Sequence, residues 1–424
     1  MGTTSQKIQY LGETKDLLKY GINSIGGNIT SQTTFRDYAT ELDSIYANLP
    51  KVSGTGTNIS LSPTRKGRIT SQINGDTLQD GTPTPSTPVA IQSVTGLQNV
   101  SVCGKNLFNK DSVTFSNGIY DDNGNYQAST SSWYTNNYYP VKSNTQYILS
   151  GTISTNGSPT RIYYYDKDKN WISRSASSST NSITFTTPNN CRYIRIQVNN
   201  AISLNTGDVQ LELGPTATTY EAFSGETYPI NLGTIELNKI ENYQDYISGT
   251  PNNWVVNQNI GNITFDGSSD EGWAASLNSN ETYYTVRADI SDMVPDNNWD
   301  ADNPNIFDDK FNYVPYSDIY YANNEGISRY TGSNTNKRIY ICIAKSRLDT
   351  TSAWLTAFRT WLSTNNLKVV YQLQTPTTTP ITNQELITQL NNWYYAMSKN
   401  GETNISVDGN LPMILDVSAL KGEE

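Results

Sequence analysis

The residues of this chain best suited to chemistry are aromatic side chains that stand beside Asn, Asp and Ser. A pyranose ring stacks its apolar CH face on an aromatic ring, while amides and carboxylates take its hydroxyl groups. Three clusters have this composition, at residues 133–139, 163–171 and 289–309. The pattern predicts a glycan-binding surface with the contact candidates Trp133, Tyr134, Tyr138, Tyr139, Tyr164, Trp171 and Trp299.

A purely structural role competes with this interpretation. Residues 163–165 are three consecutive tyrosines in a predicted strand, so successive rings face opposite sides of the sheet. At least one ring then belongs to a core, and covering a face of the sheet suffices to explain the others. Residues 133–139 lack apolar alternation and are surrounded by Ser and Asn, which favours an exposed loop. We therefore expect replacement of Trp133 and Tyr134 by Ala to weaken ligand binding without unfolding the protein.

The absence of histidine excludes several kinds of active site. A Ser-His-Asp triad, a Cys-His pair and a histidine zinc site all need a residue that this chain lacks. A glycoside hydrolase needs only two carboxylates, and residues 266–271 and 289–309 are conceivable sources. No acid/base motif anchors either source, so we expect a non-enzymatic protein without a cofactor.

Asp166, Asp168 and Asn170 have the spacing that opens a calcium-binding loop. The segment lacks the glycine at the sixth position and the distal bidentate Glu of an EF-hand, so turn residues between two strands are favoured and no metal is predicted. The three cysteines show no CxxC spacing. We expect reduced, mostly buried thiols in a protein that folds in a reducing cytoplasm.

Charge and hydropathy exclude two classes of partner. The formal net charge is −10 and the pI is near 4.7, which repels nucleic acid and anionic membranes. No apolar run approaches the 18 residues of a transmembrane helix, and the residues after Met1 show no signal-peptide hydrophobic region. We expect neither nucleic acid nor membrane as a partner.

The composition predicts β-structure as the scaffold for the aromatic clusters. Charged residues make up 16% of the chain, against roughly 25% in ordinary soluble proteins. Ser, Thr, Asn, Gln and Gly fill the difference, while 8 Trp, 29 Tyr and 9 Phe supply the bulk that a core requires. The predicted fold class is mainly β, with a short N-terminal helical region and two jelly-roll-like β-sandwich modules, the second with inserted helices.

Residues 1–50 differ from the rest because their apolar residues follow helical spacing. A first run ends at Gly26-Gly27, and a second begins at Thr34 as N-cap and ends at Leu49-Pro50. Helices this short are marginal alone, so their apolar faces need partners. An antiparallel hairpin, a bundle of three copies and docking into a larger assembly all remain open. The attachment or trimerisation candidates are Ile8, Leu11, Leu18, Ile22, Phe35, Tyr38, Leu42, Ile45 and Leu49.

Turn signals divide the remaining chain into three parts. Residues 51–103 are rich in Gly, Ser, Thr and Pro, which predicts a linker with β segments, an Asn74-Gly75 hairpin turn and a stiff extended run at 82–88. Residues 104–223 carry short strands at the spacing of a β-sandwich, at 145–153, 160–165, 182–186, 193–198 and 209–213. Residues 224–424 form a second β module with helices near 352–364 and 383–398, the latter opened by a Thr382 capping box.

Two short segments near opposite ends of the β-rich region are similar to each other. Thr57–Leu61 reads TNISL and Thr403–Val407 reads TNISV. Two such segments that bracket the intervening modules could close one sheet from both ends.

Several segments together resemble virion adhesion proteins of tailed phages that infect Gram-positive bacteria. Tyr10–Lys19 (YLGETKDLLK) followed by Thr34–Ala39 (TFRDYA) is similar to a helical head on many such fibre and baseplate proteins. The entry and exit of their carbohydrate-binding-module-like sandwich resemble Ile73–Val89 with Gly104–Asn109 (GKNLFN), and Gln210–Glu221 (QLELGPTATTYE). The module that follows resembles Tyr228–Leu237 (YPINLGTIEL) and Thr360–Asn366 (TWLSTNN).

The resemblance implies a virion protein, made in the host cytoplasm, that is usually trimeric and meets the host envelope. Other virion proteins are the expected partners of the N-terminal helices. Host cell-wall glycan is the expected ligand on the basis of the aromatic clusters, because the resemblance by itself does not prove a sugar ligand. Similar heads and modules also occur on capsid fibres, so tail or baseplate and capsid surface both remain open. The alternatives are therefore a capsid head fibre or decoration protein, and a polysaccharide depolymerase.

Overall fold

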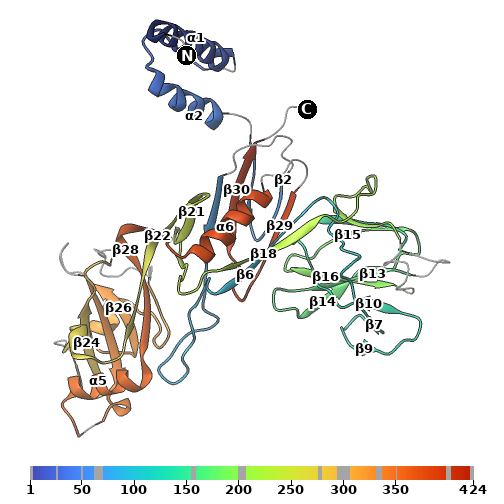
Figure 1. The fold of residues 1–424 in the computed structure, drawn as a ribbon. Helices are drawn as coiled ribbons and strands as arrows, with labels where there is room; N and C mark the ends of the chain where they lie inside the picture. The colour runs from blue at the N-terminus through green and yellow to red at the C-terminus, as the bar shows by residue number, and fades with distance from the viewer. Residues whose placement is uncertain are drawn as a thin grey trace.

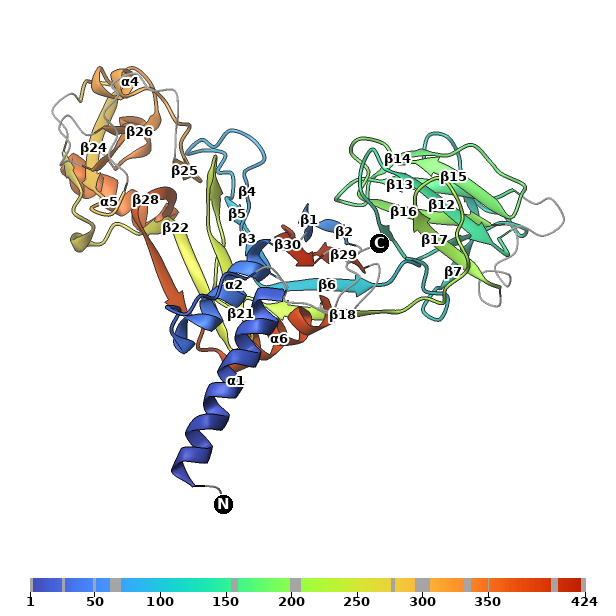
Figure 2. The same cartoon turned by 90° about the horizontal axis from the view of Figure 1, so that it is seen from above.

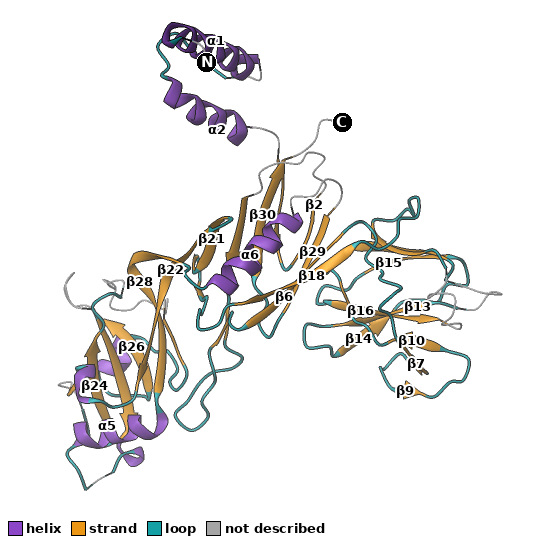
Figure 3. Cartoon of the chain, in the orientation of Figure 1, coloured by secondary structure: helices purple, strands orange, loops and turns teal. Residues whose placement is uncertain are grey.

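The structure is a computed structural model that describes residues 3–24, 27–48, 51–61, 70–153, 159–198, 207–275, 279–293, 306–330, 337–349, 351–397 and 403–420. It is mainly β, with 43% strand and 19% helix, which confirms the prediction of a mainly β chain with an N-terminal helical region. Two β-rich parts lie on opposite sides of a central β-rich part, and the N-terminal helices stand apart from all three (Figures 1 and 3).

The two predicted N-terminal helices are present as α1 (Thr4–Ser24) and α2 (Tyr38–Asn48), the latter preceded by the 3-10 turn η1 (Phe35–Asp37). Thr34 stands at the cap position, but its hydroxyl donates to the Asp37 carboxylate and no side chain caps the backbone N–H groups. The helices meet only at their adjoining ends, where Ile22, Ile29 and Tyr38 are buried and Ile45 packs on them.

Most of α1 projects away from the rest of the chain (Figure 2). Its apolar stripe and part of that of α2 therefore face solvent, whereas a full antiparallel hairpin would have covered both. Leu49 lies outside the described residues. The exposed fractions of the predicted contact residues are 65% for Ile8, 66% for Leu11, 44% for Leu18, 55% for Phe35 and 42% for Leu42.

The central part is built from strands at both ends of the β-rich region. A four-stranded sheet has the order β18-β6-β29-β2, and a seven-stranded sheet has the order β1-β30-β3-β21-β22-β28-β25. The strands that lie in the central part are β1 (Lys51–Gly56), β2 (Asn58–Leu61), β3 (Thr70–Asn74), β6 (Leu97–Cys103), β18 (Gly225–Asn231), β21 (Tyr246–Thr250), β29 (Thr403–Asp408) and β30 (Ile414–Leu420).

The two similar segments pair with each other, as the sequence predicts. Strand β2 runs antiparallel to β29 with Ile59 opposite Ile405, and β1 runs antiparallel to β30. Residues 51–103 are therefore not a linker with isolated β segments, because four of their strands belong to the two central sheets. The predicted boundary at residue 224 also divides this part, since its core joins side chains from Ile59 to Ala419.

Helix α6 (Gln384–Met397) covers the central core with Leu390, Trp393 and Met397. The sequence places the helix correctly but assigns its cap to Thr382. In the structure the side chain of Asn383 caps it, because its Oδ1 accepts hydrogen bonds from the backbone N–H groups of Glu385 and Leu386 at 3.0 and 3.2 Å.

Two long strands carry the chain from the central part to the outer part formed by residues 261–373. They are β22 (Asn253–Phe265) and β28 (Leu367–Pro380), paired antiparallel over most of their length with a register shift between Gln258 and Ile260. Helix α5 (Trp354–Asn365) packs Phe358 and Leu362 on this outer core, as predicted. The remaining elements are η2 (Ser269–Glu271), β23 (Ala274–Ala275), β24 (Tyr283–Asp289), β25 (Ile306–Asp308), α4 (Tyr316–Tyr320), β26 (Gly326–Tyr330), β27 (Arg338–Ala344) and η3 (Lys345–Arg347).

Residues 104–223 form two sheets that contribute to one core. A six-stranded sheet has the order β14-β13-β16-β10-β7 with β11 also paired to β16, and a three-stranded sheet has the order β15-β12-β17. Side chains such as Ile194 from the first sheet and Leu149 and Leu211 from the second share that core. The strands are β7 (Phe115–Asn117), β8 (Ile119–Tyr120), β9 (Tyr126–Gln127), β10 (Trp133–Thr135), β11 (Tyr139–Pro140), β12 (Gln146–Gly151), β13 (Arg161–Tyr165), β14 (Trp171–Arg174), β15 (Ser182–Thr186), β16 (Tyr193–Val198) and β17 (Val209–Leu213).

The predictions of a hairpin turn at Asn74-Gly75 and of a stiff extended run at 82–88 are wrong. Asn74-Gly75 does not close a hairpin, because β3 pairs with β21 and β30 while β4 (Thr77–Leu78) pairs with β5 (Gln92–Ser93). Gly75 instead lies against backbone, where an added Cβ would come within 2.6 Å of the Leu237 carbonyl carbon. The proline-rich run forms a loop with a Thr84–Thr87 bridge and reaches the outer part, where Arg347 donates to the Ser86 hydroxyl at 2.6 Å. The small strands β19 (Lys239–Ile240) and β20 (Tyr243–Gln244) pair nearby.

The pairing of β29 generates a stability prediction. Ile405 is 2% exposed in the central core, so Ile405→Ala should lower the free energy of unfolding by about 2–5 kcal/mol. Urea unfolding followed by circular dichroism measures the change. Asp416→Ala on the exposed side of β30 is the matched control and should change stability by less than about 0.5 kcal/mol. Equal effects of the two substitutions would contradict the assigned pairing.

Candidate functional site

The outer face of the six-stranded sheet is covered by aromatic rings. In β13, Ile162 and Tyr164 face the inner core, so Tyr163 and Tyr165 lie on the opposite face. In β16, Tyr193 shares that outer face, and it stands opposite Tyr165 in the register. Both faces of this sheet therefore carry aromatic rings, which are mixed with aliphatic residues on the inner face.

A buried arginine holds the centre of this aromatic face. The guanidinium carbon of Arg195 lies 4.4 Å from the ring centroid of Tyr134 and 5.0 Å from that of Tyr138. Its Nε donates to the Thr135 carbonyl oxygen at 2.6 Å. A cation over aromatic rings in a desolvated place contributes on the order of 2 kcal/mol. Arg195 therefore ties strand β16 to the segment that contains the predicted contact rings.

The hairpin of β8 and β9 covers part of the face. The ring of Tyr120 contacts those of Tyr134, Tyr163 and Trp171 at centroid distances of 5.1, 5.4 and 5.8 Å. Gly124 lies directly on Trp171, because an added Cβ would approach the indole ring within 2.5 Å. Its φ of +80° also favours glycine. Trp171 is thus held between the sheet and the turn of this hairpin.

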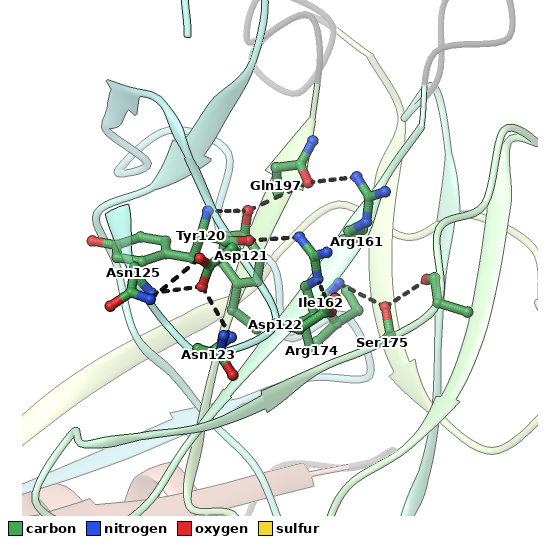
Figure 4. Close-up of polar contacts among 12 residues, drawn as sticks. Tyr120, Asp121, Asp122, Asn123, Asn125, Arg161, Ile162, Arg174, Ser175 and Gln197 are labelled. Carbon is green, nitrogen blue, oxygen red and sulfur yellow. Dashed lines mark hydrogen bonds and ion pairs between the residues drawn. The ribbon is translucent and has the colours of Figure 1, made fainter. Parts of the chain in front are cut away.

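Polar contacts fix the turn of the hairpin (Figure 4). Asp121 accepts hydrogen bonds from the backbone N–H groups of Asn123 and Asn125, both at 2.9 Å, and those contacts lower its pKa. Arg174 pairs with the Asp122 carboxylate at 2.6 Å and donates to the Tyr120 carbonyl oxygen. The turn therefore presents amide and carboxylate groups beside the rings in a defined arrangement.

A second set of polar side chains lies on the sheet beneath the same hairpin. The Tyr163 hydroxyl accepts from the backbone N–H of Tyr120 at 3.0 Å and donates to Gln197 Oε1 at 3.4 Å, and Arg161 donates to the same oxygen at 3.3 Å (Figure 4). Burial raises the pKa of Tyr163. These side chains are engaged with one another, so the groups open to a ligand lie at the edge of the face.

The structure places the predicted contact rings in three different environments. Tyr134, Tyr139 and Tyr164 are 8%, 7% and 5% exposed, so these three rings are buried and do not form the solvent-exposed contact surface that the sequence predicts. Trp133 is half-buried and packs on the inner core. The segment 133–139 is not a loop, because Trp133 pairs with Asn117 and Val198 in adjoining strands.

Tyr138 and Trp171 are the predicted rings that stay half-exposed on the outer face. Trp299 lies outside the described residues. Tyr134 is buried, so the double substitution of Trp133 and Tyr134 by Ala would destabilise the sheet rather than probe a surface.

Sequence reasoning missed four residues that complete this face. Tyr120 and Tyr126 come from the hairpin, and Tyr126 is 54% exposed. The ammonium group of Lys169 lies 5.4 Å from the ring centroid of Tyr138. Arg195 could have been found from the alternation of β16, where Ile194, Ile196 and Val198 face inward and the residues between them must face outward.

The calcium candidates form a turn, which is the interpretation that the sequence favours. Asp166 accepts hydrogen bonds from the backbone N–H groups of Asp168 and Asn170 at 2.9 and 2.8 Å, and Asn170 Nδ2 also donates to it. Asp168 pairs with Lys167 instead of facing Asp166. Within the described ranges, no group of three or more His, Cys, Asp or Glu side chains is arranged to hold a metal ion.

The buried thiols and the carboxylate of Glu271 have surroundings that suit a structural role. Cys191 and Cys342 are buried, and burial raises their pKa values to about 11 and about 12, which disfavours the nucleophilic thiolate. Glu271 accepts hydrogen bonds from the backbone N–H groups of Asp266 and Gly267 and from the indole of Trp273. Each of these side chains therefore packs in a core or forms hydrogen bonds within its own turn.

Comparison with known proteins adds no relative, since no protein family model, curated protein or solved structure matches the chain. None of the helices in the described ranges combines the length and apolar character that a membrane span needs.

Asp308 supplies a pH-dependent prediction. Its carboxylate is 3% exposed and accepts hydrogen bonds from the backbone N–H groups of Lys310 and Phe311, and burial raises its pKa from 3.8 to about 7. A raised carboxyl pKa favours folding below the unfolded value, and this contribution is lost as pH rises from about 4 to 7. The free energy of unfolding should fall across this range by up to about 1.4 kcal/mol per pH unit from this group.

Asp308→Asn isolates that contribution. The variant should show a shallower slope of unfolding free energy against pH between about 4 and 7, as urea titrations at several pH values would measure. Asp245 keeps some slope in the variant, because burial raises its pKa to about 6. An unchanged slope in Asp308→Asn would contradict the assignment.

Proposed function

We propose that this protein is a non-enzymatic fibre or receptor-binding protein of a tailed phage that attaches to host cell-surface glycan. The observation that carries the proposal is the aromatic outer face of the six-stranded sheet, where Tyr138, Trp171 and Tyr126 reach the surface beside the amides and carboxylates of residues 121–125. Rings that are already packed against one another lose little freedom when a sugar stacks on them.

The finer description of the fold belongs to this proposal. Residues 104–223 would be a jelly-roll-like, carbohydrate-binding-module-like β-sandwich, which the core shared by their two sheets supports. A second sandwich module would lie in the outer part that β22 and β28 reach. Attachment to other virion proteins and assembly of three copies would be the task of α1 and α2, whose exposed apolar residues support a partner there.

Two other functions use the same architecture. A capsid head fibre or decoration protein would differ only in its place on the virion, and antibody labelling of intact particles separates it from a tail or baseplate protein. A polysaccharide depolymerase would release reducing ends from host polysaccharide, which a reducing-sugar assay detects. The surroundings of two candidate carboxylates favour the adhesin, because Asp308 and Glu271 accept hydrogen bonds from backbone N–H groups.

The glycan-binding proposal predicts the effect of removing single rings. Trp171→Ala and Tyr138→Ala should each weaken binding to immobilised cell-wall polysaccharides of Gram-positive bacteria by about two- to tenfold, because one stacked ring contributes about 0.5–1.5 kcal/mol. Tyr243→Ala removes a ring that is 44% exposed from the small strand β20, away from the outer face, and is the control. Thermal unfolding of each variant identifies losses that come from instability.

The polysaccharide panel can contradict the proposal in two ways. Absence of binding by the unaltered protein to every polysaccharide argues against a glycan receptor. Equal weakening by Tyr243→Ala argues against the outer face as the binding surface.

The exposed stripe of α1 predicts self-association. Ile8, Leu11 and Leu18 follow the 3-4 spacing of a coiled coil and are exposed in the single chain, so three copies could bury them against one another. Light scattering of the full-length protein should give three times the chain mass of 47.1 kDa, and the double variant Leu11→Ser, Leu18→Ser should shift it towards that of one chain. Glu13→Ser, at a position of the same helix outside this stripe, is the control, and a single-chain mass for the unaltered protein would contradict the prediction.

A further inference from the structure

A cavity of about 460 Å³ lies where the four-stranded central sheet meets residues 104–223. The sheet side is lined by small polar residues from neighbouring strands, and the opposite side by apolar and aromatic residues. Ser60, Ser101 and Ser406 line the sheet side, and Leu107, Tyr139 and Tyr147 line the other. The volume lies within the roughly 300–1,000 Å³ that small-molecule sites occupy.

The polar side of the cavity follows from strand alternation. Ile59, Val102 and Ile405 fill the central core, so the serines next to them in β2, β6 and β29 face the other way. The Ser101 hydroxyl bonds with that of Thr227 at 2.9 Å. A hydroxyl group can donate once and accept twice, so these side chains keep capacity for a ligand.

Two groups on the opposite side lack partners that a ligand would supply. The Tyr139 hydroxyl is buried without a hydrogen-bond partner in the described part of the chain. Lys142 is the one Lys or Arg among the described residues that line the cavity, and its ammonium group forms no ion pair with any of them. Partial burial lowers the pKa of Lys142, so an anion beside it would restore the preference for the charged form.

One acidic residue also lines the cavity. Glu226 is exposed, and one of its carboxylate oxygens accepts a hydrogen bond from the Tyr228 hydroxyl at 3.0 Å. Its charge is therefore screened by solvent, whereas that of Lys142 is partly desolvated. The charge complementarity of the enclosed region favours an anionic ligand.

We propose that this cavity binds a sugar ring that carries one anionic group, a carboxylate or a phosphate. The apolar face of the ring would lie against Tyr139 and Leu107, its hydroxyls would bond with the serines of the sheet, and its anion would pair with Lys142. This site goes beyond the proposed function, because it is formed by other side chains than the outer aromatic face and does not require that face to bind.

Cys103 lines the same cavity and gives a local readout. It is half-buried, while Cys191 and Cys342 are buried with raised pKa values, so iodoacetamide should alkylate Cys103 first. Glucuronate and glucose 6-phosphate, each at about twice its dissociation constant, should slow this alkylation by a factor of about three, as mass spectrometry of the Cys103 peptide measures. Glucose at the same concentration should protect less.

Matched variants separate this site from the outer face. Lys142→Gln should remove the protection by both anionic sugars, and Trp171→Ala should keep it. Protection that persists in Lys142→Gln, or glucose that protects as well as the anions, would overturn the charge pairing. Failure of both anions to slow alkylation would overturn the site, and it would leave the polysaccharide result for Trp171→Ala unaffected.

A second measurement tests the site if iodoacetamide does not alkylate Cys103. Ligand-observed saturation-transfer NMR with glucuronate and glucose 6-phosphate compares the unaltered protein with Ser406→Trp, which fills the cavity from β29. A loss of saturation transfer in the variant supports the site, provided that its thermal unfolding matches that of the unaltered protein. Equal saturation transfer in both proteins would overturn it.

Discussion

The hydrogen-bonded insertion of the last two strands between strands near the start of the β-rich region is the constraint on which the rest of the structure depends. Strand β29 lies between β6 and β2, and β30 lies between β1 and β3. The chain therefore leaves the central part to form the outer parts, and the central sheets are completed by the strands that follow its return. Such pairing joins residues more than about 300 positions apart, and pairing over such separations slows folding. The cavity beside this sheet depends on that pairing, because β2, β6 and β29 all line it.

The aromatic composition has a second consequence, because a sheet with rings on both faces needs cover on both. The inner face of the six-stranded sheet packs on the three-stranded sheet. Within the described part of the chain no second sheet packs on the outer face, which is covered by the β8–β9 hairpin, by Trp171 and by ring-to-ring contacts around Arg195. Most of these rings therefore pack against one another. The surface that a ligand can reach is the edge where Tyr126, Tyr138 and Trp171 are exposed to solvent. A high content of aromatic residues therefore indicates core packing more than it indicates a binding surface.

Local signals of the sequence predict elements well, and nonlocal pairing limits the rest. The bounds of β15, β16, β17 and α5 follow from alternation, helical spacing and turn residues that act over a few positions. The Asn-Gly turn at residue 74 misleads, because long-range pairing of β3 decides its geometry. The same limit applies to the contact rings: Trp133 and Tyr134 have the polar neighbours of a loop, yet β7 and β16 pair with them on either side. Only the TNISL and TNISV repeat carried a long-range signal, and it paired as predicted.

Strand β11 shows why the two proposed surfaces are physically linked although they are separate sites. Tyr138 stands beside Tyr139 in sequence, and the two rings face opposite sides of the sheet. Tyr138 contacts Tyr165 and lies over Arg195 on the outer face, while Tyr139 packs on Phe108 and lines the cavity against the central sheet. A movement of β11 would therefore change both surfaces at once. Strand β11 is held to the sheet by two residue pairs with β16 and by these ring contacts on its two sides.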